Sequence, residues 1–241
     1  MYAWELIKET LLRKSFVPVI HLVWFCLYLF VAQVTSDQDG VLERIPFVLG
    51  GLLLPIILSM GIFGNDIVSG RIAVLVTKPL PFFELYIWRY CGLVFQGFIH
   101  LVMTGVIVLV INRLFGYGSV EQLHVWLIAS LLLFSAVAAL STTVSIIAKR
   151  NNNLMILVGL LLIVLAFKIH LASVQSHVTK CVDMIVTYGL PSAELLYRSA
   201  ARECSFSQRL GTASYVIALT LMYIAVGVLL LTYKEFRRQC D

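Results

Sequence analysis

Soft-ligand side chains recur at helical spacing in the C-terminal third of the chain. His177, Cys181 and Met184 stand at positions i, i+4 and i+7, so a helix would place all three on one face. Imidazole, thiolate and thioether groups in such an arrangement can hold copper or haem. Three such residues also meet by chance in a chain of 241 residues. The spacing leaves a soft-metal site open, but we expect this chain to bind no metal or other cofactor of its own.

Polar residues inside long apolar runs are a second source of chemistry. An ionisable group within a membrane span is a functional hypothesis by default. His100 lies beside Gln96 in one such run and can line a path for a transported molecule, or bond a neighbouring helix. The hydroxyls of Ser141 and Thr142, near the end of another run, can line a polar path or bond the carbonyls of their own helix.

Motifs for nucleotide hydrolysis and for common intramembrane chemistry are missing from the sequence. The stretch nearest to a phosphate-binding loop, GNDIVSGR at 64–71, has the wrong spacing and Arg in place of Lys. No HExxH or GxSxG motif occurs. The five cysteines show no CxxC spacing, although Cys181 and Cys204 can form a disulfide if their compartment is oxidising. We therefore expect a protein that is not itself an enzyme.

The elements that must position these residues are membrane helices. Hydrophobic residues make up 60% of the chain and charged residues 13%, against about 25% charged in soluble domains. A span needs about 20 apolar residues, and in lipid the backbone must satisfy its own hydrogen bonds as a helix. Six stretches qualify: 16–34, 45–63, 88–111, 125–148, 154–172 and 214–233. The sequence predicts an all-α integral membrane protein of six spans, forming a single domain over 1–241. Pro46 and Pro55 predict a kink in the second span.

Basic residues at the ends of the short loops set the expected orientation. Six crossings put both termini on one side, and the short-loop Lys and Arg residues favour the cytoplasm. The same placement at span ends, rather than in one patch, argues against a nucleic-acid partner. Residues 1–14 read as an amphipathic helix on the inner surface, or as a plain extension of the first span. Residues 173–210 predict short outer helices, either re-entrant or lying on the surface.

A charged, proline-marked segment separates the second and third spans. Residues 65–86, which we call the coupling segment, hold a helix-compatible core stopped by Pro79 and lie on the cytoplasmic side of the predicted topology. A short rigid helix across the ends of two spans can transmit a push, whereas a solvated loop, the alternative reading, would absorb it. Charge partners for a docking protein stand in and just after this segment: Arg71, Lys78, Glu84 and Arg89.

This stretch resembles the signature region of ABC transporter type-2 permeases, the membrane subunits of ABC exporters. The family pattern is an acidic residue, Gly four positions on, a hydrophobic pair, a Pro and then a basic residue. The matching positions here are Asp66, Gly70, Leu75 with Val76, Pro79 and Arg89. The six-span plan, the leading amphipathic helix and the basic tail also match.

The resemblance implies partners as well as a fold. Such permeases pair with a second permease subunit and with two cytoplasmic ATPase subunits, which bind the ATP and Mg²⁺. The coupling segment would dock on the ATPase, and substrate would move outward. The resemblance also implies residence in the bacterial inner membrane. Two rival functions remain open, a membrane-embedded enzyme acting on lipid and a scaffold that transports nothing; a co-purifying ATPase would separate transport from both.

Overall fold

The structure, a computed structural model, describes only part of the chain. The described residues are 23–24, 26–30, 44, 46–63, 66–67, 82–115, 120–148, 156, 193–200 and 204–240. The predicted surface helix at 1–14, nearly all of the fifth span and the centre of the coupling segment lie outside these residues. Every regular element within the described ranges is helical. The elements are η1 (Phe47–Leu53), α4 (Leu54–Ser59), α7 (Phe82–Phe115), α8 (Leu123–Ile147), α11 (Ala193–Ala200) and α12 (Phe206–Cys240).

Three of these helices are long and apolar enough to cross a membrane. They comprise Phe83–Phe115, Leu123–Ile147 and Phe206–Tyr233, each with a mean hydropathy of 2.2 or more. They cover the predicted third, fourth and sixth spans. The prediction of an all-helical membrane protein is therefore confirmed at this level.

The second predicted span forms a shorter and less regular helix than the sequence suggested. A π-helical stretch, η1, runs directly into α4, and Pro55 stands in the first turn of α4. A proline lacks the N–H of the helical ladder and crowds the preceding turn, so a widened turn ahead of it relieves the clash. The 13 residues of Phe47–Ser59 span about 20 Å at 1.5 Å per residue. The chain then turns at Gly61, whose φ of 68° suits a residue without a Cβ.

Two helices extend well beyond their predicted spans. The sequence places the third span at 88–111, but α7 begins at Phe82 and ends at Phe115. Glu84 in its first turn and Arg113 in its last turn both complement the helix dipole, which favours these extra turns. The sixth predicted span, 214–233, lies within α12, which runs for 35 residues. At 1.5 Å per residue α12 is about 50 Å long, so it projects past a hydrocarbon core of about 30 Å.

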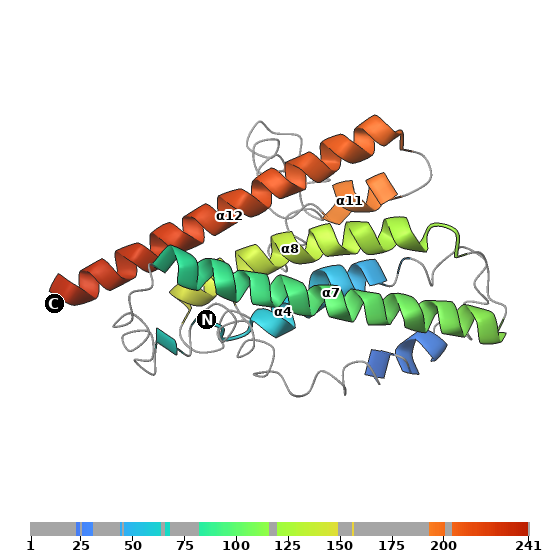
Figure 1. Cartoon of the computed structure of the whole chain (residues 1–241), viewed down its shortest axis with the longest axis horizontal. Coiled ribbons are helices and arrows are strands. Elements are labelled where there is room, and N and C mark those ends of the chain that lie inside the picture. The colour runs from blue at the N-terminus through green and yellow to red at the C-terminus, as the bar shows by residue number, and fades with distance from the viewer. Residues whose placement is uncertain are drawn as a thin grey trace, which may run out of the picture.

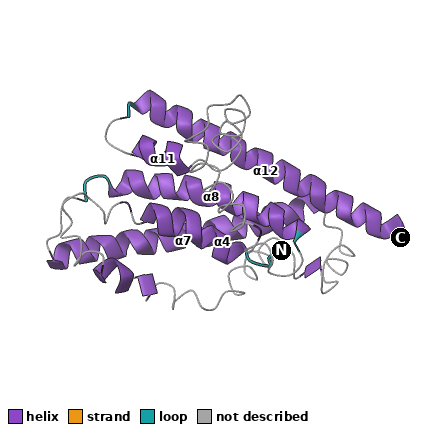
Figure 2. Cartoon of the chain, turned by 180° about the vertical axis from the view of Figure 1, so that it is seen from behind, coloured by secondary structure: helices purple, strands orange, loops and turns teal. Residues whose placement is uncertain are grey.

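Helix α8 forms the centre of the bundle. It contacts every other element, η1, α4, α7, α11 and α12. Figure 1 and Figure 2 show α8 between α12 on one side and α7 on the other, seen from opposite faces. Ile128 and Ile147 are the large apolar side chains of α8 that stay exposed. By contrast α7 and α12 each carry an outward apolar face, as helices in contact with lipid do.

The described long helices run in two opposite directions (Figure 1). In Figure 1 the colours show α7 running one way, while η1 with α4, α8 and α12 all run the other way. The predicted second, fourth and sixth spans should be parallel to one another and antiparallel to the third. The C-terminus of α8 and the start of α12 therefore lie at opposite ends of the bundle.

A short amphipathic helix, α11, closes the end of the bundle where α8 begins. Leu196 and Ala200, one turn apart, are each 1% exposed and pack in a cluster with Phe47, Trp126 and Val216. The Tyr197 ring lies 5.1 Å from that of Trp126 and 5.9 Å from that of Phe47, measured between centroids. A short helix within 173–210 is thus found where the sequence expects one, packed on the ends of η1 and α8.

Candidate functional site

A buried ion pair joins the two flanks of the coupling segment. The Nη2 of Arg89 donates a hydrogen bond to Oδ2 of Asp66 over 2.9 Å, and the two side chains are 0% and 4% exposed. Asp66 precedes the centre of the coupling segment, whereas Arg89 lies two turns into α7. The attraction between opposite charges is strong in a low-dielectric interior, where each charge would be costly alone. The pair therefore holds the N-terminal end of the coupling segment against α7.

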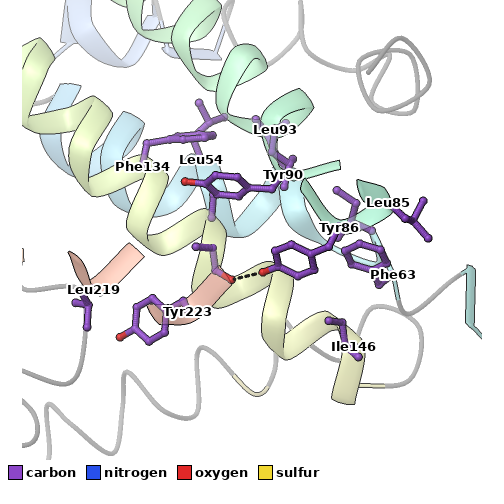
Figure 3. Packing of buried hydrophobic residues seen from close by; sticks show 14 of the residues in the cluster. Leu54, Phe63, Leu85, Tyr86, Tyr90, Leu93, Phe134, Ile146, Leu219 and Tyr223 are labelled. Atoms are coloured by element: carbon purple, nitrogen blue, oxygen red, sulfur yellow. Dashed lines mark hydrogen bonds between the residues drawn. The ribbon is translucent and has the colours of Figure 1, made fainter. Parts of the chain in front are cut away.

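A pair of aromatic rings makes a second link between the same two flanks. The rings of Phe63 and Tyr86 stack with centroids 5.6 Å apart and planes 9° from parallel. Both side chains are fully buried, and Figure 3 shows the two rings next to each other. Each aromatic residue precedes the charged residue of its flank by three positions, Phe63 before Asp66 and Tyr86 before Arg89. Two buried contacts, which we call the double tether, thus join residues 63–66 to the start of α7.

The Tyr86 hydroxyl carries this tether on to two more helices. It shares a hydrogen bond of 3.0 Å with Oγ1 of Thr143 in α8 and lies 3.3 Å from the carbonyl oxygen of Ala139. A hydrogen bond drawn from this hydroxyl is visible in Figure 3. The Thr143 hydroxyl in turn lies 2.9 Å from the carbonyl oxygen of Tyr223 in α12. One buried hydroxyl pair therefore connects α7, α8 and α12.

A glycine in α12 makes this close contact possible. A Cβ atom built on Gly227 would lie 2.5 Å from Cε2 of Tyr86 and 2.6 Å from its hydroxyl oxygen. Such distances are below any contact that real Cβ atoms make, so α12 can approach the Tyr86 ring only because residue 227 has no side chain. The fit of Tyr86 against Gly227 sets the spacing of α7 and α12 at this end.

Serines of α8 hold the end of α4 from the other side. The hydroxyls of Ser59 and Ser141 hydrogen-bond each other, and both side chains are buried. The backbone N–H of Phe63 donates to Oγ of Ser145 over 3.1 Å. This bond supplies a partner for a backbone donor in the turn after α4, which would otherwise be unsatisfied. We call the whole set, listed here, the tether site: Ser59, Phe63, Asp66, Tyr86, Arg89, Thr143, Ser141, Ser145, Tyr223 and Gly227.

The predicted coupling residues divide into three groups. Asp66 and Arg89 come together, and the Arg89 guanidinium faces Asp66 inside the bundle rather than an open surface. Glu84 is exposed in the first turn of α7, so its carboxylate stays accessible to a docking protein. The others lie outside the described residues: Gly70, Arg71, Leu75, Lys78 and Pro79. Residues 82–86, assigned from the sequence to the coupling segment, form the start of α7.

The predicted pathway residues lie in two places, the hydroxyl residues on α8 and the amide and imidazole residues on α7. Ser141 pairs with Ser59, and the Thr142 hydroxyl donates to the carbonyl oxygen of Ala138 over 2.6 Å. Thr142 therefore follows the alternative in which a hydroxyl bonds its own helix. Gln96 and His100 are both buried on α7, at 4% and 1% exposure. The His100 ring lies 6.5 Å from that of Trp24, between centroids.

The proposed soft-metal face and the disulfide have different outcomes. His177, Cys181 and Met184 lie outside the described residues. Within the part of the chain that the structure describes, no three His, Cys, Asp or Glu residues group as metal ligands. Cys204 is a free cysteine whose thiol donates to the carbonyl oxygen of Arg198 over 3.2 Å. The disulfide between Cys181 and Cys204 is therefore not formed in this structure.

Sequence reasoning did not single out Phe63, Tyr86, Thr143 or Gly227 as parts of one site. The available signal was the repeated spacing, with an aromatic residue three positions before a charged one on each flank of the coupling segment. Residues three apart in a helix share a face, so the repeat predicts paired contacts once the flanks are placed together. Comparison with protein-family models and with curated proteins finds no match for this chain.

Proposed function

We propose that this protein is the membrane-spanning permease subunit of an ATP-driven exporter of the ABC type-2 kind. In this proposal residues 65–86 dock on a separate cytoplasmic ATPase, and movement of the ATPase opens and closes a path through the bundle. A second permease subunit completes the path. The chain contributes no ATP chemistry of its own, because its sequence carries no phosphate-binding loop.

The double tether is the observation that carries the proposal. A segment that receives a push must be fixed firmly at both flanks, or the push is lost in local movement. Both flanks here are fixed by buried contacts, Asp66 to Arg89 and Phe63 to Tyr86. The contacts of Tyr86 and Thr143 then reach α8 and α12. A displacement of the segment would therefore move three helices together.

The directions of the described helices add support. The end of α8 and the beginning of α12 lie at opposite ends of the bundle (Figure 1). The chain between α8 and α12 therefore has to pass from one end of the bundle to the other. A fifth span at 154–172 would provide this crossing. The tether site lies at the end where α8 finishes and α7 begins. With cytoplasmic termini, that is the end nearest the ATPase.

Co-purification from the native host tests the proposal. The chain, carrying an affinity tag, is expected to bring down an ATP-hydrolysing protein in stoichiometric amount after extraction in mild detergent. Substituting Gly70 and Pro79 together should weaken that association, or uncouple ATP hydrolysis from export in vesicles. An intact chain that purifies without an ATPase would overturn the proposal and favour a lipid-acting enzyme or a scaffold.

A further inference from the structure

A row of buried polar atoms lies on one face of α7, away from the tether site. Gln96, His100 and Thr104 are spaced by four residues, so they share a face. Gln96 is 4% exposed and Thr104 is fully buried, yet Oε1 of Gln96 and Oγ1 of Thr104 have no hydrogen-bond partner. In folded proteins the great majority of buried polar atoms have a hydrogen-bond partner, so each exception needs an explanation.

A third such atom comes from the first predicted span. The Trp24 ring contacts that of His100, which places this described part of the span beside the polar row. Tyr28 follows Trp24 by one helical turn, so it points to the same side. Tyr28 is fully buried, and its hydroxyl also lacks a hydrogen-bond partner. Two neighbouring elements thus turn unsatisfied groups inward.

These atoms lie near the middle of the membrane. Residues 96 and 104 flank the midpoint of the apolar stretch Phe83–Phe115, each within about 8 Å of it at 1.5 Å per residue. Lipid chains at that depth offer no hydrogen bonds. In the closed arrangement of this structure a second copy of the chain does not supply the partner either, because the atoms are buried within a single chain. Water or a transported molecule remains as the partner.

We propose that Gln96, Thr104 and Tyr28, with Trp24 and His100, form the wall of the translocation path, held closed in this structure. The inference rests on the transport role proposed above and identifies the class of cargo. The described residues of this wall include no carboxylate, Lys or Arg. The path therefore takes a molecule with uncharged hydrogen-bonding groups, such as hydroxyls or amides, next to an apolar or aromatic surface that packs on Trp24. A charged cargo would meet no carboxylate, Lys or Arg among these described residues as a counter-ion in this low-dielectric position.

Thiol labelling in unsealed native membrane fragments, in which MgATP and the reagent reach both faces, tests this wall without knowledge of the cargo. In a variant with all five cysteines replaced by Ala, Gln96→Cys and Thr104→Cys are introduced singly and treated with a membrane-impermeant, charged methanethiosulfonate. Val102→Cys and Val106→Cys are the matched controls, because these residues lie on the outward face of the same helix at the same depth, 46% and 49% exposed. Ser207→Cys, exposed at the start of α12, reports that the reagent works.

We expect Gln96→Cys and Thr104→Cys to react at least tenfold faster than the Val controls in at least one of two conditions, with MgATP or without it. Gln96 and Thr104 test the wall independently, so a fold defect in one variant leaves the other to decide. Labelling no faster than the Val controls in both conditions would overturn the proposal and make the row a sealed structural feature. If labelling is fast but no ATPase co-purifies, the water-accessible wall is supported and the exporter function is refuted.

Discussion

Asp66 and Arg89 are bound to each other in the interior of the bundle, 23 positions apart in the chain. The same two residues are the acidic and basic positions of the sequence pattern that resembles type-2 permeases. Their charges therefore pair with each other within the chain, and this ion pair connects the N-terminal end of the coupling segment to α7. Glu84, five residues before Arg89, keeps an exposed carboxylate.

Breaking this ion pair should destabilise the protein strongly. Arg89→Ala removes the guanidinium from a buried carboxylate, and such a loss costs about 3–5 kcal/mol in comparable buried pairs. The expected result is a large fall in the apparent melting temperature in detergent, measured by intrinsic fluorescence or by loss of the monodisperse peak. Glu84→Gln, at an exposed position on the same helix, is the control and should change little. Equal stability of both variants would contradict a structural role for the pair.

Gly227→Ala should disturb the contact between α7 and α12. The new methyl group would lie 2.5 Å from the Tyr86 ring, and overpacking of this kind costs about 1–3 kcal/mol. Gly211→Ala is a matched control on the same helix, because nothing lies within 4 Å of a Cβ there. That control should be neutral or stabilising by up to about 1 kcal/mol, through better helix propensity. If the two substitutions had the same effect on the melting temperature, the close approach at Tyr86 would be refuted.

Two adjacent threonines should respond differently to the same isosteric change. Thr143→Val removes a hydroxyl that reaches the Tyr86 hydroxyl and the Tyr223 carbonyl, whereas Thr142→Val removes one that bonds only within α8. Loss of a buried hydrogen bond with its partners left unsatisfied costs about 1–3 kcal/mol. Thermal unfolding in detergent should show Thr143→Val as clearly less stable than Thr142→Val. The opposite order would argue against a link between three helices.

Truncation of Leu196 should release α11 from the bundle. This side chain is 1% exposed and packs with Trp126 and Phe47, so Leu196→Ala should cost about 2–5 kcal/mol locally. The measurable result is faster protease cleavage around α11, with the rest of the bundle still folded. The neighbouring Leu195 is half-buried, and Leu195→Ala is the comparison. Equal cleavage rates for the two variants would mean that α11 is not anchored through Leu196.

Apolar runs of about 20 residues were enough to predict the long helices, because lipid leaves a backbone few alternatives to the helix. The ends were harder to predict. The predicted third span, 88–111, stops short of Glu84, whereas α7 includes this residue, whose carboxylate complements the dipole of the first turn. The π-helical start of the second span depends on how Pro55 fits its preceding turn, which no hydropathy pattern encodes.

The candidate site was only half visible in the sequence. Asp66 and Arg89 could be singled out as charged residues near span ends, but their partnership could not, since a charge that turns inward looks the same in sequence as one that faces water. The roles of Tyr86 and Gly227 follow from the packing of α7 against α12, residues about 140 positions apart in the chain. Such contacts between distant segments are set by the tertiary structure.

Photocrosslinking from position 84 tests the central claim most directly. A photoreactive residue in place of Glu84, at the exposed start of α7, should form a covalent adduct in the native host with a protein that carries a phosphate-binding loop and hydrolyses ATP. The same residue in place of Glu121, exposed at the opposite end of the bundle, should form no such adduct. An adduct with an ATPase at 84 but not at 121 is the result that we predict. No ATPase adduct at 84, or one at 121 instead, would contradict docking of a motor at the coupling segment.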